Sequence, residues 1–274
     1  MKWKKNWIIC SIIVLVIFAV CFIKLRSPTR IIAEQTEVIL EHSSDERKKS
    51  EQDQEETSLS DDESDSGASE DTYTSPIDFN ALWKDSEDIY AWLDIPGTQI
   101  SYPILQNEED DTYYLRRNAK GESDVNGVLY TEATYNSRDF SDPLTVVYGH
   151  NMKSGLMFGT LQEMYSSQEL LDEHSEIIIY MPDRELHYKV FAAVPFDNRH
   201  ILYNYDMSDE RTFRLFFQEV LSVRSLEAVF AEDTFVQSDE KVVILSTCLT
   251  GDRSKRFLVC GKLSETVPDV TNRS

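Results

Sequence analysis

The sequence has few basic residues and few glycines for a chain of 274 residues. Lysine and arginine number 27 against 49 aspartates and glutamates, which gives a formal net charge of −22. Non-specific attraction to nucleic acid needs a basic surface, so this balance excludes a nucleic-acid partner chosen by charge. The chain also has no glycine-rich phosphate loop, no CxxC pair and no HExxH. Nucleotide and structural zinc sites therefore have no support in the sequence, and we expect no cofactor.

Cysteine is scarce as well. Two of the four cysteines, Cys10 and Cys21, lie in an apolar N-terminal run, which leaves Cys248 and Cys260 for the rest of the chain. Two cysteines are too few for a disulfide framework. They can still form one disulfide, and this possibility stays open on the sequence alone.

The N-terminus carries a long uncharged segment. Residues 7–23 hold no charge, and three basic residues flank them on each side. The segment is slightly short for a hydrocarbon core of ~30 Å, and a snorkelling Lys24 extends it. The stretch "FAVCFIK" has neither a small-x-small cleavage site nor a small residue directly before its cysteine, which argues against a cleaved signal peptide and a lipoprotein signal. We expect residues 1–33 to be a cytoplasmic tail and a single-pass signal anchor, spanning about 7–23, in the cell membrane.

The charge pattern leaves the orientation of this anchor undecided, because the two flanks carry nearly the same number of basic residues. A short N-terminal tail usually stays inside, so we place the C-terminal part outside the cell.

Residues 34–76 contain fifteen acidic and three basic residues and nine serines. Such a segment cannot bury enough apolar surface to fold, so it is expected to be a disordered tether.

Residues 77–274 have the composition of a folded domain. Apolar spacing predicts one or two helices within 79–92, and two strands flank the Pro96-Gly97 turn. The further elements that we expect are strands in 126–132 and 144–151, a short helix in 159–166, a hairpin in 175–196, a helix over 208–223 capped by Ser208, and strands at 241–248 and 256–263 joined by a loop over 249–255. Short strands with inserted helices favour a mainly antiparallel barrel over a doubly wound sheet.

Cys248 ends an apolar strand where the chain turns polar. A cysteine nucleophile needs a neighbouring cation, helix dipole or base. If the last two strands form a hairpin, Arg256 at the start of the second lies beside Cys248 at the end of the first. Arg256 is then placed to favour the thiolate and to donate to an oxyanion. The other interpretation is a buried or disulfide-linked cysteine.

His150 is the histidine best placed to be an acid–base partner. It follows "TVVYG" at another strand end, where Gly149 allows the backbone to turn. His200 in "NRHILY" is the second candidate. The remaining histidines lie in the tether, in a helix–strand connector and inside a predicted strand: His42, His174 and His187.

The residues around these candidates resemble a known family. "LSTC" with Arg256 eight residues on, "VVYGHN" about a hundred residues upstream and the N-terminal anchor together resemble the sortases, cell-surface cysteine transpeptidases of Gram-positive bacteria. The stretches "WLDIPGTQISYPILQ" and "NGVLY" and the helix before the cysteine strand are most similar to class B members. The resemblance covers roughly residues 78–263. The family's commoner threonine four residues before the cysteine is Ile244 here.

The resemblance implies a closed eight-stranded β-barrel with N-terminal helices and a long helix inserted before the cysteine strand. It implies that Cys248 is the nucleophile, His150 the general acid and base, and Arg256 the group that holds the substrate carbonyl or oxyanion. Ser246 and Thr247 are expected to contribute hydrogen bonds to the substrate. The implied substrates are surface proteins with a C-terminal sorting signal, cleaved after threonine. The implied acceptor is an amine of peptidoglycan or of its lipid-linked precursor.

Two alternatives stay open on the sequence, and a third does not match it. The chain can be a pilin polymerase of class B, or a non-enzymatic surface-binding module with a Cys248–Cys260 disulfide. A second family of cysteine transpeptidases usually has glycine directly before its cysteine and arginine two after, but Thr247 and Thr250 stand there. The sorting motif is not determined, whether of the Asn-Pro-x-Thr, Ser-Pro-x-Thr or Leu-Pro-x-Thr-Gly type. The acidic residues 108–111 are expected to be a solvated loop rather than a calcium site, and no metal ligands are predicted.

Overall fold

The computed structural model describes residues 73–232 and 234–268. The expected anchor within residues 1–33 and nearly all of the tether over 34–76 lie outside these residues. Within the described part, no helix is both long enough and apolar enough to cross a membrane. The described residues include most of the predicted catalytic domain, residues 77–274.

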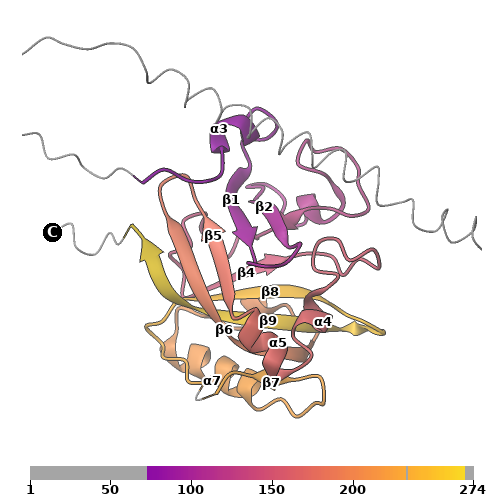
Figure 1. Ribbon diagram of the computed structural model, residues 1–274, viewed down its shortest axis with the longest axis vertical. Helices are drawn as coiled ribbons and strands as arrows, with labels where there is room; N and C mark the ends of the chain where they lie inside the picture. The colour runs from indigo at the N-terminus through magenta and orange to yellow at the C-terminus, as the bar shows by residue number, and fades with distance from the viewer. Residues whose placement is uncertain (1–72, 233, 269–274) are drawn as a thin grey trace, which may run out of the picture. The chain divides into compact units, whose positions relative to one another are not determined.

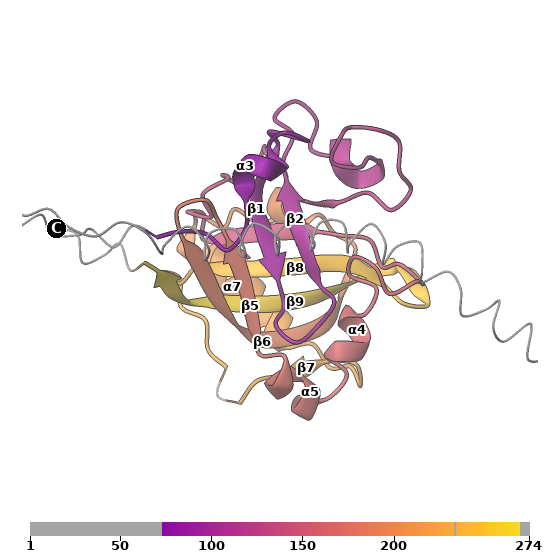
Figure 2. The same cartoon turned by 45° about the horizontal axis from the view of Figure 1, so that its top comes forward.

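Eight strands close into a barrel, as the resemblance to the sortases implies. Around the barrel the strands are β1 (Ile89–Asp94), β2 (Ser101–Leu105), β3 (Leu129–Tyr130), β4 (Leu144–Tyr148), β8 (Val242–Leu249), β9 (Asp252–Val267), β6 (Glu185–Asp197) and β5 (Glu176–Tyr180). Pairing of β5 with both β1 and β6 completes the ring, and β7 (Val229–Phe230) adds to the side of β6. The pairs β2–β3 and β4–β8 are parallel, and all the other pairs are antiparallel. The fold is therefore mainly β, with β8 and β9 side by side (Figures 1 and 2).

The central strands are covered on both faces. Along β8, Val243 and Leu245 belong to the cluster inside the barrel, whereas Val242 and Ile244 pack into a second cluster outside it. Successive side chains of a strand point to opposite faces. A strand whose two faces are both buried therefore has a continuous run of apolar residues. This explains the unbroken "VVIL" that precedes the polar end of the strand.

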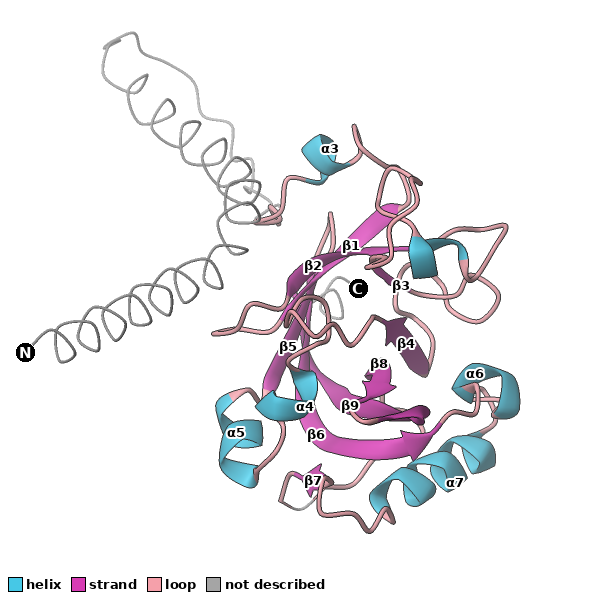
Figure 3. Ribbon diagram, turned by 90° about the vertical axis from the view of Figure 1, so that its right-hand side faces the viewer, coloured by secondary structure: helices cyan, strands magenta, loops and turns pink. Residues whose placement is uncertain are grey.

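The outer cluster is covered by α7 (Glu210–Leu221), which the chain inserts after β6 and before β7 and β8. Its buried residues are Phe213, Phe216, Phe217 and Val220, at the spacing of one helical face. Figure 3 shows α7 and α6 (Ile201–Asn204) outside the barrel wall. The helix begins after Asp209, whose carboxylate accepts a hydrogen bond from the amide of Thr212 at 2.7 Å. The predicted cap at Ser208 is therefore one residue early.

The other helices are short: α3 (Phe79–Leu82), the 3-10 helix η1 (Tyr113–Arg116), α4 (Leu161–Met164) and α5 (Gln168–Glu173). The predicted helical segment 79–92 is wrong in its second half, because Ile89 and Trp92 lie in β1. The predicted loop over 249–255 is also too long, since β9 begins at Asp252. The Pro96-Gly97 turn and the hairpin of β5 and β6 are confirmed.

Candidate active site

Cys248 and Arg256 face each other across β8 and β9. The strand register pairs the two residues, and Nη1 of Arg256 lies 3.5 Å from Sγ of Cys248. Both side chains are partly exposed. The guanidinium carries a permanent positive charge, so at this distance it can stabilise negative charge on the sulfur. The predicted pairing of these two residues across a hairpin is confirmed.

His150 lies at the same end of the barrel. The parallel register of β4 and β8 pairs Tyr148 with Ser246, and the amide of Gly149 donates to the carbonyl of Ser246 at 3.2 Å. β4 ends at Tyr148, and the side-chain amide of Asn151, two residues after Gly149, donates to the carbonyl of Cys248 at 2.8 Å, which brings the segment that carries His150 next to Cys248. Three neighbouring strands thus bring the three predicted catalytic residues to one edge, and their roles stay a prediction.

The imidazole of His150 is held by a backbone carbonyl. Its Nε2 lies 2.7 Å from the carbonyl oxygen of Leu115, in η1. A carbonyl only accepts, so Nε2 carries the hydrogen, and Nδ1 of the neutral ring is left with its lone pair. This arrangement leaves one ring nitrogen able to take up a proton.

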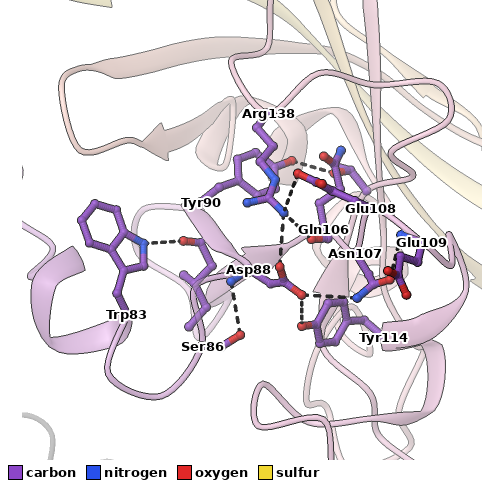
Figure 4. Close-up of polar contacts among 12 residues, drawn as sticks. Trp83, Ser86, Asp88, Tyr90, Gln106, Asn107, Glu108, Glu109, Tyr114 and Arg138 are labelled. Carbon is purple, nitrogen blue, oxygen red and sulfur yellow. Dashed lines mark hydrogen bonds and ion pairs between the residues drawn. The ribbon is translucent and has the colours of Figure 1, made fainter.

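A polar network fixes η1 and so the carbonyl that His150 contacts. The carboxylate of Asp88 accepts from Tyr114 at 2.6 Å and from Nη2 of Arg138 at 3.2 Å (Figure 4). The same Nη2 donates to the carbonyl of Gln106 at 2.8 Å. Because Tyr114 precedes Leu115, this network ties the position of His150 to the barrel.

Ser246 and Thr247 are both buried. Strand alternation puts Ser246 on the same outer face as Cys248 and puts Thr247 on the inner face. The Thr247 hydroxyl is among the buried polar atoms without a hydrogen-bond partner in the described part of the chain. The geometry therefore brings Ser246, but not Thr247, onto the face of the candidate nucleophile.

His200, the second candidate, is engaged elsewhere. Its Nε2 lies 2.9 Å from the carboxylate of Glu132, and its Nδ1 accepts from the amide of Tyr203 at 3.1 Å as the N-cap of α6. Glu132 is the one charged side chain in the buried set of the described residues. Burial, only partly offset by the hydrogen bond from His200, raises the pKa of Glu132.

Cys260, four residues past Arg256 and on the same face of β9, is a core residue and not a part of the candidate site. It is fully buried in the outer cluster, and burial raises its pKa well above the ordinary range. Both Cys248 and Cys260 are free. Cys260 pairs with Ile244, four residues from Cys248, or roughly 13 Å along the strand, and a disulfide needs Cα atoms within about 7 Å. The disulfide-linked alternative is therefore wrong.

Two side-chain amides near Cys248 were not singled out from the sequence. Nδ2 of Asn151 donates to the carbonyl of Cys248 and to the hydroxyl of Thr250, each at 2.8 Å. The oxygen Oε1 of Gln162 accepts from the amide of Thr250 at 2.9 Å. The position of Asn151 directly after His150, within "VVYGHN", is the one sequence signal that could have drawn attention to it.

Two carboxylates of the acidic segment 108–111 accept hydrogen bonds from the protein, one locally and one from a distant residue. Asp110 accepts from the amide and hydroxyl of Thr112, and Asp111 accepts from the amide of Thr134 at 3.1 Å. Over residues 73–232 and 234–268, no group of three or more His, Cys, Asp or Glu side chains is arranged to hold a metal ion.

Comparison with known proteins places this geometry in a family. A model of the sortase domain matches residues 93–264, a segment that contains Cys248, His150 and Arg256. The chain is 30% identical over 184 residues to sortase B of Listeria monocytogenes serovar 1/2a, which covers 66% of this chain and 72% of the relative.

Solved structures agree. Sortase B from B. anthracis, in complex with AAEK2, superposes with a TM-score of 0.58 and 28% identity over 71% of this chain and 88% of that one. A Staphylococcus aureus sortase B–substrate complex has a TM-score of 0.58 at 24% identity, over 68% of this chain and 84% of that one, and this likeness shows the shared fold. The chain therefore belongs to the sortase family of cysteine transpeptidases, and the relatives that it resembles are class B enzymes.

Proposed function

We propose that this sortase cleaves a C-terminal sorting motif after threonine and transfers the resulting acyl group to a peptidoglycan amine. The observation that carries the proposal is the 3.5 Å approach of Arg256 to the sulfur of Cys248 across two paired strands. A permanent cation beside a partly exposed thiol is what a cysteine nucleophile requires. The family and its class B relatives supply the type of reaction.

In the first half-reaction the Cys248 thiolate attacks the backbone carbonyl carbon of the substrate threonine. A carbon–sulfur bond forms, and the carbonyl oxygen takes the negative charge, which Arg256 stabilises as a hydrogen-bond donor. When the oxyanion collapses, the peptide carbon–nitrogen bond breaks. Protonated His150 gives its proton to the leaving amine. The product is a thioacyl enzyme.

In the second half-reaction an acceptor amine attacks the thioacyl carbon. Neutral His150 takes a proton from that amine as the carbon–nitrogen bond forms. The carbon–sulfur bond then breaks and returns the thiolate to its place beside Arg256. The proposed amine belongs to peptidoglycan or to its lipid-linked precursor.

The proposed setting is the outer surface of the cell membrane. The uncharged run at 7–23 supports a single-pass anchor in residues 1–33, and the charge of the segment 34–76 supports an extended tether. Residues 77–274 would then be the extracellular catalytic domain. Surface proteins that carry a sorting signal are the proposed partners.

The test uses the full-length chain in detergent, incubated with quenched peptides of the Asn-Pro-x-Thr, Ser-Pro-x-Thr and Leu-Pro-x-Thr-Gly types. Intact-mass spectrometry follows the adduct, with Cys248→Ala as the control. A thioacyl mass on the wild type that is absent from the variant and discharged by an added amine supports the proposal and identifies the motif. No adduct with any peptide overturns it. Supplying a peptidoglycan amine and a lysine side chain in parallel distinguishes wall anchoring from pilin polymerisation.

A further inference from the structure

The strand ladder alone does not hold Cys248 in place. Its pairing with Arg256 is the last regular pair of the hairpin, because the next pair joins Leu249 to Asp252. One step along β8 thus corresponds to four along β9, which is a bulge. On the other side, the regular pairing of β4 with β8 ends at Ser246. The nucleophile therefore lies just beyond regular pairing on one side and at its end on the other.

Two side-chain amides supply the contacts that the ladder no longer makes there. Both hydrogens of the Asn151 amide are used, one on the Cys248 carbonyl and one on the Thr250 hydroxyl, each at 2.8 Å. Gln162 accepts the backbone amide of Thr250 at 2.9 Å. We call Asn151 and Gln162 the amide latch. It holds the turn after Cys248 from the loop that follows β4, which carries Asn151, and from α4, which carries Gln162.

The loop that carries Asn151 is itself fixed. The carbonyl of His150 accepts from the amide of Phe158 at 3.0 Å, and Asn151 forms an isolated bridge with Met157. Gly149 and Gly159 have no room for a Cβ, which would lie 2.5 Å from a Leu129 methyl carbon and 2.2 Å from the Met152 carbonyl oxygen. A side chain on such a loop can hold its partner at a defined distance.

We infer that Asn151 is a positioning residue that fixes the nucleophile relative to its acid–base partner. His150 and Asn151 are consecutive, so the segment that carries the imidazole also hydrogen-bonds the backbone carbonyl of Cys248. The inference rests on the proposed function, in which these two groups act together. Misplacing reacting groups by about 1 Å costs on the order of 10²-fold in rate, which is the scale of effect to expect.

The experiment measures single-turnover thioacylation of the full-length protein with the best peptide from the motif screen, for Asn151→Ala and Asn151→Asp. Asn151→Asp keeps the size of the side chain but cannot donate to a carbonyl. We expect the maximal rate constant to fall at least tenfold in both variants, with the half-saturating peptide concentration within twofold of wild type. Gln168→Ala is the matched control, because it removes an exposed side-chain amide that donates to Asp172 within α5, away from Cys248. Thermal midpoints verify that every variant folds.

A wild-type maximal rate in Asn151→Ala or in Asn151→Asp overturns the inference, as does a loss confined to the half-saturating concentration. Failure of the proposed function looks different, because the wild type itself then forms no thioacyl enzyme. In that event the rate constant for alkylation of Cys248 by iodoacetamide, mapped to the residue by peptide mass, decides the inference without any peptide substrate. A severalfold slower alkylation in both Asn151 variants supports the latch, and equal rates overturn it.

Discussion

The guanidinium of Arg256 lies 3.5 Å from the sulfur of Cys248 because β8 and β9 pair these two residues directly. Strand pairing sets the distance between the backbones, so the charge next to the thiol is built into the hairpin. Neither side chain is fully buried, which leaves the pair accessible to a peptide. The arrangement combines a defined cation with an approachable nucleophile.

Replacing Arg256 tests whether this cation serves the chemistry. We expect Arg256→Ala to slow thioacyl formation about 10²-fold, because one donor to a developing oxyanion is worth that much. Arg256→Lys keeps the charge but loses the planar guanidinium, so its rate should lie between those of the wild type and Arg256→Ala. The rate is measured by quenched single turnover and intact mass. Arg253→Ala, an exposed arginine in the same region, is the control, and an equal loss in both alanine variants would contradict the role of Arg256.

Cys260 should not react with thiol reagents in the native protein. Its thiol is fully buried and its pKa is raised, so it should react with iodoacetamide only after denaturation, while Cys248 reacts in the folded state. Cys260→Ala should form the thioacyl enzyme at the wild-type rate and lose about 1–2 kcal/mol of unfolding free energy. Cys260→Ser buries a hydroxyl and should lose more. Labelling of Cys260 in the native state, seen by peptide mapping, would count against this account.

Much of the barrel is readable from the sequence because its strands carry strong local signals. The run before Cys248 and the turn at Pro96-Gly97 identify strands on composition alone, and the pairing of Cys248 with Arg256 follows from one hairpin. The helical prediction for 79–92 fails for a physical reason. A bulge between Ile89 and Ala91 breaks the alternation of β1, so its apolar positions mimic helical spacing.

The remainder of the site depends on contacts between distant segments. The carbonyl of Leu115 holds an imidazole 35 residues away, and the amide of Asn151 holds a carbonyl 97 residues away. Backbone carbonyls are present at every residue, so no residue type marks the one that is used. Such partners become visible only when tertiary structure brings the segments together.

Glu132 should make stability depend on pH. Its pKa is raised in the folded state by burial, so between its ordinary value of 4.5 and the raised value the folded protein binds the proton more tightly than the unfolded chain. The unfolding free energy contributed by this group therefore falls as pH rises through that window and is constant above it. We expect the difference between wild type and Glu132→Gln, measured by urea unfolding from pH 4 to 8, to follow this course. The exposed Glu227→Gln should show no such trend.

His187 should give a pH dependence of the same sign, in a window that begins at the ordinary histidine value of 6.5. Burial lowers its pKa, but hydrogen bonds to Glu176 at 2.9 Å and Glu185 at 3.1 Å outweigh that effect, and the net pKa is raised above 6.5. A raised histidine pKa stabilises the fold fully below 6.5, and the contribution is lost as pH rises through the folded value. His187→Gln should therefore be destabilised relative to wild type at pH 5.5 and match it more closely at pH 9. Thermal unfolding at both pH values, with His174→Gln as the control, checks the sign.

Gly127 tests whether the carbonyl of Leu115 matters for His150. Its φ is +57°, and an added Cβ would lie 2.7 Å from the carbonyl oxygens of both Tyr114 and Leu115. Gly127→Ala must therefore move η1 and the acceptor of the His150 hydrogen bond. Gly97→Ala is the matched control, because Gly97 has a similar φ of +77° with nothing within 4 Å of the added carbon.

Both variants should lose stability from a left-handed backbone, about 1–3 kcal/mol, and Gly127→Ala should lose more because of the contact. Only Gly127→Ala should also lower the maximal rate of thioacylation at a temperature where both proteins are folded, since only its strain reaches the imidazole. If the two variants keep equal rates while Gly127→Ala is the less stable, then the Leu115 carbonyl supports the loop and does not orient the acid–base group. A rate loss in Gly127→Ala alone would place η1 among the elements that prepare His150 for proton transfer.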